Sequence, residues 1–459
     1  YSALSSMDNY HSWGTYNVHD PSCCKLGDYY YMYSTDAILG ENRKEAEEKN
    51  VPLGFIQVRR SKDLVKWEFI GWAFPEIPHE AVEWVRSHAD GKGATNIWAP
   101  YIIPFGDKYR LYYCVSAFGL KTSYIGLAES ASPERPWMQR GCVVKTDATS
   151  VMNAIDPSII ADSATGKWWM HYGSFFGGLY CVELNPETGL PVQEGDQGHL
   201  IARRATYWKD NLEAPEIIYN PELKQYYLFV SYDPLMTTYN VRVGRSDKAE
   251  GPFVDYFGVE LKDTTNNFPI LTAPYRFNNH PGWAGTAHCA VFTSDEGQYF
   301  MAHQGRLSPH NQMMDLHLRQ VFFTSDGWPV VSPERYTGSA SRKFSAADIV
   351  GEWEIIRVQE PAYERQLQAG QILWGEGQLK NEEWNVSCTL SLKKDGQLDE
   401  NKGYWKFAER GQLLSLTLNG ESVDNLLVFA GHDWENETET VLFTGLDSRG
   451  RSVWGKRTK

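Results

Sequence analysis

Short apolar runs separated by polar turns recur along the first two thirds of the chain. Each recurring segment begins with a short apolar strand, turns at Gly, Asp, Asn or Pro, and returns through an aromatic-rich strand. This pattern is typical of a β-hairpin, and the copies start about 60 to 80 residues apart. The five segments begin at Val18, Ile97, Ala154, Leu212 and Thr286.

After each hairpin comes a run in which apolar and polar residues alternate with a period of two, as in YNVRVGRSD and DLHLRQVFFTSDG. Each repeat therefore supplies about four strands. Five four-stranded units around an axis predict an all-β fold, a five-bladed β-propeller, which exposes only short strand edges and closes on a central channel. A plain β-sandwich would not explain five copies of one motif. We assign the propeller to residues 1–336.

The amino-acid composition of the chain changes after the last repeat. The stretch TGSASRKFSAAD is rich in small and polar residues and indicates a linker at 337–350. Residues 351–459 again alternate strongly and predict a second all-β domain, a small barrel or sandwich. Its six tryptophans favour a core over a sugar-stacking surface. Only the charged stretch 42–50 is expected to be helical, as a solvated insertion in the first blade.

Charge and composition restrict the ligand. The 459-residue chain has a formal net charge of −14, and its Lys and Arg residues form nothing longer than isolated pairs. Binding to nucleic acid or to anionic lipid is therefore disfavoured, and a neutral or cationic ligand is expected. The seven cysteines show no metal-binding spacing and are interpreted as reduced core residues. No apolar run is long enough for a membrane helix, and no signal peptide is present, so the protein is either cytosolic or exported after removal of its signal.

Matching positions of the five repeats carry the candidate chemistry. Because the innermost strand of every blade lines the axis, these positions should converge on one mouth. Grouped carboxylates are costly to desolvate unless a site needs them, so their presence there favours catalysis. The position before the shared Pro, or its equivalent, holds Asp20, Ala99, Asp156, Ala214 and His288. One residue earlier stand His19, Trp98, Ile155 and Glu213.

Each of these residues also has a plain structural explanation. An Asp before Pro often caps a turn, Trp98 could pack in a core, and His288 lies in an apolar strand where most histidines are core residues. Glu213 could be an exposed rim charge, and the neighbouring Glu216 is an equally good candidate from composition alone. Taken together, these explanations would require several coincidences.

The motifs HDPS, WAP, IDPS and EAPE, followed by His288 and the closing LHLRQVFFTSDGWPVV, resemble glycoside hydrolase family 43, especially its α-L-arabinanases. The C-terminal part is similar to the lipocalin-like β-barrel that some of these enzymes carry. The resemblance implies an inverting hydrolysis with Asp20 as general base, Glu213 as general acid and Asp156 as the residue that orients the acid and tunes its pKa. It favours the Glu of Glu-Ala-Pro, and so Glu213 over Glu216.

Inverting hydrolysis makes independent demands on such a pair. One carboxyl must be protonated and the other ionised, on opposite faces of the sugar and roughly 6.5 to 9.5 Å apart. The pKa of the acid should be raised to about 6 by burial and a nearby like charge.

Aromatic and polar residues at neighbouring strand ends are expected to bind the sugar. Trp98 and Phe118 would form a stacking platform, as the resemblance also implies, and Trp13 and Phe176 are candidates to extend it. The residues expected to hydrogen-bond the furanose or to hold the base are His19, Asn153, Ser174 and Arg306.

The resemblance implies one cofactor, a hydrated calcium ion that His288 would ligate at the axis. Calcium prefers several oxygen ligands, so water would have to supply most of its shell.

The expected substrate is arabinan or an arabino-oligosaccharide, cleaved by an endo-acting monomeric enzyme that is secreted, periplasmic or on the cell surface. An exo-acting α-L-arabinofuranosidase or β-xylosidase on the same fold is the nearest alternative. A non-catalytic sugar-binding propeller and a protein-interaction hub are the other two, but neither needs three convergent carboxylates.

Overall fold

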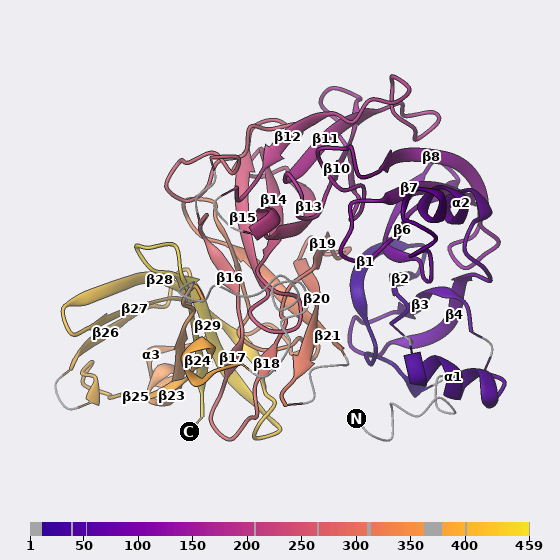
Figure 1. Cartoon of the computed structure of the whole chain (residues 1–459). Helices are drawn as coiled ribbons and strands as arrows, with labels where there is room; N and C mark the ends of the chain where they lie inside the picture. The colour runs from indigo at the N-terminus through magenta and orange to yellow at the C-terminus, as the bar shows by residue number, and fades with distance from the viewer. Residues whose placement is uncertain are drawn as a thin grey trace.

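The computed structural model describes residues 12–37, 40–51, 53–205, 208–263, 266–309, 314–361, 379–399 and 402–458. The chain is built almost entirely of strands, and the last of these form a separate group in Figure 1, coloured orange to yellow. In the described part of the chain, no helix is long and apolar enough to cross a membrane.

The first four repeats form the blades of a β-propeller. Each blade is an antiparallel four-stranded sheet whose strands pair in chain order. The first comprises β1 (His19–Leu26), β2 (Tyr29–Thr35), β3 (Phe55–Ser61) and β4 (Glu68–Phe74), and the second β5 (Trp98–Phe105), β6 (Lys108–Ser116), β7 (Ser123–Ser130) and β8 (Met138–Thr146). The third comprises β9 (Ser158–Ala161), β10 (Trp168–Tyr172), β11 (Leu179–Leu184) and β12 (His199–Ala202), and the fourth β13 (Leu212–Asn220), β14 (Gln225–Tyr232), β15 (Asn240–Ser246) and β16 (Ile270–Thr272).

The fifth repeat departs from the predicted pattern. Its strands pair in chain order, but β20 also pairs with β18, so that all of them belong to a seven-stranded sheet that reaches β24 of the C-terminal part. The structure therefore shows four separate four-stranded blades rather than the five that the repeats predict. This sheet comprises β17 (Tyr275–Arg276), β18 (Trp283–Ala284), β19 (Cys289–Thr293), β20 (Tyr299–Leu307), β21 (Asp315–Phe323), β22 (Pro329–Val331) and β24 (Asn385–Val386).

The expectation of a single helix is wrong. The charged stretch does form α1 (Gly40–Glu48), but α2 (His79–His88) follows β4. Ala81 and Val85 of α2 are buried in the apolar cluster of the first two blades, so this helix is amphipathic and covers the sheets. Three further short helical segments in the described part of the chain are η2 (Trp208–Asp210), α3 (Ala346–Ile349) and η3 (Asn381–Glu383).

The C-terminal part is a second seven-stranded antiparallel sheet with the order β25-β23-β30-β29-β28-β27-β26. Of its six tryptophans, four are buried as expected and Trp434 is 37% exposed, while Trp374 lies outside the described residues. The four buried ones are Trp353, Trp384, Trp405 and Trp454. The strands are β23 (Gly351–Arg357), β25 (Cys388–Leu392), β26 (Gly403–Ala408), β27 (Leu413–Leu418), β28 (Glu421–Asp433), β29 (Thr438–Leu446) and β30 (Ser452–Arg457).

One apolar cluster joins the two parts of the chain. Ile356 and Trp454 of the C-terminal sheet, and Val358 just after β23, are buried among residues of the fourth and fifth repeats. The ring of Trp454 meets that of Tyr275 edge to face, with centroids 5.5 Å apart. Burial of such aromatic surface is a main source of folding free energy, so each part completes the core of the other.

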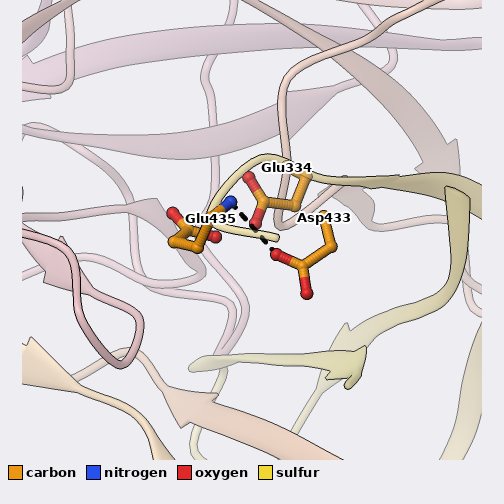
Figure 2. Close-up of side chains that lie close together, drawn as sticks. All are labelled: Glu334, Asp433 and Glu435. Atoms are coloured by element: carbon orange, nitrogen blue, oxygen red, sulfur yellow. Dashed lines mark hydrogen bonds between the residues drawn. The ribbon is translucent and has the colours of Figure 1, made fainter. Parts of the chain in front are cut away.

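A buried cation reinforces this contact. The carboxyl groups of Glu334, which follows β22, and of Asp433 and Glu435 at the end of β28 converge, as Figure 2 shows. They are close enough together to hold a metal ion. In this structure the ammonium of Lys456 on β30 lies among them, 2.9 Å from Glu334 Oε1, 3.0 Å from Asp433 Oδ1 and in contact with Glu435. Lys456 is fully buried, and its pKa is raised because the carboxylates outweigh the desolvation that would lower it.

Removing this cation should destabilise the fold. A buried charge that loses its partner costs about 3–5 kcal/mol, so Lys456→Met should lower the free energy of unfolding by roughly that amount in urea titration. The matched control is Lys167→Met, which breaks the exposed ion pair with Glu183 and should leave the titration nearly unchanged. Equal effects of the two substitutions would contradict the assignment of Lys456 as a structural cation.

Candidate active site

The repeated position before the shared Pro has an unusual backbone in every repeat. Its five residues all have left-handed dihedrals, with φ of 49° at Asp20, 38° at Ala99, 57° at Asp156, 54° at Ala214 and 51° at His288. Such a conformation costs a residue other than glycine of the order of 1–3 kcal/mol and is typical of functional sites.

The strands are bulged at the same places. Register shifts occur between His19 and Ser22 in β1 and between Glu213 and Glu216 in β13. A bulge interrupts the alternation of side chains, so two successive residues can face the same side. In consequence, His19 and Asp20 both line the central cavity.

The structure brings the ten residues expected in catalysis, sugar binding or metal binding to one cavity of about 440 Å³. Apolar residues such as Leu235, Met236 and Met314 complete its wall, together with Phe176. The ten are His19, Asp20, Trp98, Phe118, Asn153, Asp156, Ser174, Glu213, His288 and Arg306.

Asp20 is an ionised carboxylate held from three sides. Its Oδ1 lies 2.8 Å from Nδ1 of His288, while its Oδ2 accepts a hydrogen bond of 2.7 Å from Thr35 and lies 3.3 Å from Nδ1 of His19. Burial alone would raise the pKa of Asp20, but the two histidines and the hydrogen bonds hold that pKa well below its usual range.

Glu213 has the opposite character. Burial raises its pKa above the ordinary value, and the charge of Asp20 acts in the same direction. Its Oε2 accepts a hydrogen bond from Ser174 Oγ and its Oε1 accepts one from Tyr239 Oη, both 2.7 Å long, and these oppose the rise. The pKa of Asp156 is also raised, by burial first and then by Glu213 and Asp20. The cavity therefore combines one carboxyl whose pKa is lowered with two whose pKa values are raised.

The three basic residues around Asp20, namely His19, His288 and Arg306, also differ in their charge. Although burial would lower it, the pKa of His288 is raised to about 9 by Asp20 and the other carboxyls. Burial lowers the pKa of His19 to about 4, aided by Arg306, whose Nη2 lies 3.5 Å from His19 Nε2. Near pH 7 this arrangement has a charged Arg306 and His288 and a neutral His19.

The aromatic platform is present, but only one of its two expected extensions is. Trp98 and Phe118 meet edge to face with centroids 6.3 Å apart, and Phe118 is 45% exposed. Phe176 lines the cavity, and the ammonium of Lys209 lies 4.4 Å from its ring centroid. Trp13 is wrong as a cavity residue: it is 1% exposed and packs on Phe69 in a small apolar cluster.

Glu216, the alternative candidate for the general acid, has a structural role. Glu216 is buried, its Oε2 accepts a hydrogen bond from Ser158 Oγ and its Oε1 accepts one from the backbone N–H of Val291. It thus links the third, fourth and fifth repeats, and among the described residues it is not part of the cavity wall. Burial raises its pKa to about 7, so a perturbed pKa by itself does not mark the acid.

Two contacts of the carboxylates were not foreseen from the sequence. Thr35 ends β2, just after the first hairpin motif, and Tyr239 precedes β15 as the first residue of the alternating run YNVRVGRSD, outside the hairpin motif that carries the candidate residues. The signal for Thr35 was its place opposite His19 in the first hairpin, where the two are register partners. Nothing in the sequence around Tyr239 marks it.

The surroundings of His288 fit a metal ligand in one respect. Its Nδ1 is taken by Asp20, which leaves Nε2 available, and a carboxylate behind the ligating imidazole is a common arrangement at metal sites.

A central cavity that brings three carboxyl groups together beside aromatic side chains, with the pKa of one carboxyl lowered and the pKa values of the other two raised, is the arrangement expected of a glycoside hydrolase. The chain belongs to the glycosyl hydrolases of family 43, whose model matches residues 14–329, and a C-terminal lipocalin-like domain matches 333–455.

Three similar proteins illustrate the relationship. The extracellular endo-alpha-(1->5)-L-arabinanase of Thermotoga petrophila is 29% identical over 96% of this chain and 94% of its own length. A crystal structure of endo-1,5-alpha-L-arabinanase from that organism matches with a TM-score of 0.79 at 27% identity, over 97% of this chain and 99% of the other. An extracellular exo-alpha-(1->5)-L-arabinofuranosidase of Cellvibrio japonicus is 30% identical over 71% of this chain and 90% of its own.

Proposed function

We propose that this protein is an endo-arabinanase that hydrolyses α-1,5-linked L-arabinofuranosyl bonds in arabinan with inversion of configuration. The observation that carries the proposal is the pair of Asp20 and Glu213, which face one cavity with pKa values shifted in opposite directions. The similarity to endo-acting relatives over nearly the whole chain supports the substrate.

In this mechanism Asp20 is the general base. Its ionised carboxylate takes a proton from a water molecule as that water attacks the anomeric carbon. Thr35 and His288 hold the two oxygens of Asp20 in place, and keep them ionised. A low pKa makes Asp20 a weak base in the ground state. It also keeps the carboxylate ionised, and therefore able to accept a proton, over the whole neutral pH range.

Glu213 is the general acid. The rise in its pKa favours the protonated carboxyl, whose proton passes to the glycosidic oxygen as the bond to the anomeric carbon breaks. Asp156, another carboxyl with a raised pKa in the same cavity, orients Glu213 and raises its pKa further whenever Asp156 is itself ionised.

The sugar is bound by a few residues of the cavity wall. Trp98 and Phe118 stack against the apolar face of a furanose ring. Hydrogen bonds to its hydroxyls come from four polar residues, namely His19, Asn153, Ser174 and Arg306. Ser174 would serve both the sugar and Glu213.

The proposal also includes a calcium ion, and His288 is the only residue that we propose as its ligand. The Nε2 of His288 would be its protein ligand, and the chemistry it supplies is a positive charge that offsets the carboxyl groups of the cavity. None of the steps above requires it.

The finer domain description is also proposed. The strands β19–β22 act as the fifth blade of a five-bladed propeller, because His288 before β19 has the same left-handed backbone as its counterparts in the other four repeats. The propeller would end at residue 336, the linker would span 337–350 and the C-terminal domain 351–459. The protein would be secreted and monomeric, and its relatives are extracellular.

Substitution of the two carboxylates tests the mechanism. Asp20→Asn and Glu213→Gln should each lower kcat by about 10²-fold to 10⁴-fold on debranched arabinan, because each removes one proton-transfer step. Glu216→Gln is the matched control and should keep kcat, since Glu216 lies between strands instead of in the cavity wall. An inactive, folded Glu216→Gln with an active Glu213→Gln would reverse the assignment.

The stereochemistry of the first product tests the single displacement. Proton NMR of an arabino-oligosaccharide digest should show the β-anomer before mutarotation, because water attacks the face opposite the leaving oxygen. Release of the α-anomer would mean that Asp20 acts as a nucleophile through a covalent intermediate.

The product pattern distinguishes endo from exo action. An endo-acting enzyme should release a ladder of oligosaccharides from linear arabinan in the first minutes, and should act poorly on para-nitrophenyl arabinofuranoside, because remote rings supply binding energy used at the reacting centre. Arabinose as the sole early product would support the exo-acting alternative, which the relative from Cellvibrio japonicus represents.

A further inference from the structure

We propose that Tyr239 is a positioning residue for Glu213: it holds Oε1 from inside the fold, so that the transferable proton is carried by Oε2 beside Ser174. This inference rests on the proposed function, in which Glu213 is the general acid. It adds which of the two carboxyl oxygens delivers the proton and which residue determines that choice.

The two oxygens of Glu213 have unlike surroundings. Ser174, the donor to Oε2, is part of the cavity wall. Tyr239, the donor to Oε1, is fully buried and, in the described part of the chain, does not belong to that wall. The oxygen that a substrate can reach is therefore Oε2.

Tyr239 is held rigidly. Its ring is part of the apolar cluster that includes Trp283 and Ala287, and its backbone N–H donates to the carbonyl of Pro234. Burial raises the pKa of the phenol well above its ordinary value, so the hydroxyl keeps its proton and acts as a donor. A fixed donor of this kind fixes the orientation of the carboxyl plane.

The proton balance follows from these contacts. When Glu213 is protonated, Oε2 carries the hydrogen, and the Ser174 hydroxyl can turn to accept instead of donate. When that proton moves to the glycosidic oxygen, the electron pair of the O–H bond stays on Glu213. The new carboxylate then accepts from both hydroxyls, the arrangement seen in the structure. Because hydrogen bonds to charged groups are the stronger ones, Tyr239 stabilises the charge that develops as the proton leaves.

Other charged groups also face Glu213 and set the baseline for its titration. Asp20 of β1, Asp156 before β9, His288 before β19 and Arg306 of β20 share its cavity. Asp20 raises the pKa of Glu213, and His288 lowers it. Replacing Tyr239 leaves all four in place, so a change in the pH profile can be attributed to the lost hydroxyl.

The test is Tyr239→Phe, assayed on two substrates of the same chain length. On an arabino-oligosaccharide, kcat should fall by about 10-fold to 100-fold with KM within about twofold, because the hydroxyl lies outside the cavity wall. On the dinitrophenyl glycoside of the same oligosaccharide, whose leaving group needs little protonation, the loss should be below about threefold. The alkaline limb of kcat/KM should move to higher pH, because a hydrogen bond that lowers the pKa of Glu213 is gone.

Tyr112→Phe is the matched control. Tyr112 is equally buried, but its hydroxyl donates to the carbonyl of Gly189 instead of to a carboxyl. Its removal should lower stability without changing the ratio of the two substrates. The ratio does not depend on the fraction of active protein. If Tyr239→Phe does not fold, incorporation of 3,5-difluorotyrosine at position 239 keeps the shape and strengthens the donor, and the alkaline limb should then move to lower pH.

Glu213→Gln, measured in parallel, separates the two hypotheses. If it retains activity on the oligosaccharide, the proposed acid is wrong and this inference falls with it. If Glu213→Gln is inactive, Glu213 remains the acid. In that case the positioning role of Tyr239 is overturned when Tyr239→Phe lowers kcat equally on the two substrates, or lowers it on neither.

Discussion

The site depends on a backbone conformation that is repeated five times. A left-handed residue at the start of each innermost strand breaks the alternation of side chains, and this lets adjacent residues such as His19 and Asp20 face the axis together. Each such residue is strained, and four of them precede a proline. The surrounding sheets must offset that strain, so the rigidity of the propeller and the convergence of its carboxyl groups have the same origin.

The same geometry explains why three acidic groups can share a small cavity. Asp20 is surrounded by donors that lower its pKa, whereas the partly buried Glu213 and the buried Asp156 lie near that charge and their pKa values are raised. Shifts in opposite directions reduce the repulsion that three carboxylates of the same pKa would experience in one cavity. Burial and hydrogen bonding therefore divide chemically similar groups into a base and an acid.

Much of this could be predicted from the sequence because the repeat itself carries the information. A motif that recurs in one register places its residues on one axis, and the residues taken from it, such as Asp20, Asp156 and Glu213, line the cavity. Features outside the shared hairpin motif have no such signal: the sequence does not predict α2, it misplaces Trp13, and the contact of Tyr239, just before β15, with Glu213 arises only in the folded chain. The fifth repeat was predicted as a separate sheet, but pairing of β18 with β20 joins it to strands near the C-terminal part, a long-range contact that local periodicity does not encode.

The shared core and the buried lysine have a consequence for how such proteins can be recombined. Trp454 completes an apolar cluster of the propeller, and Lys456 neutralises Glu334, which belongs to the other part of the chain. A propeller grafted onto a different partner domain would keep its catalytic groups but expose apolar surface and leave Glu334 without its counterion. The C-terminal domain therefore stabilises the propeller and cannot simply be exchanged for another domain. We expect the residues at the contact between the two parts to change together during evolution.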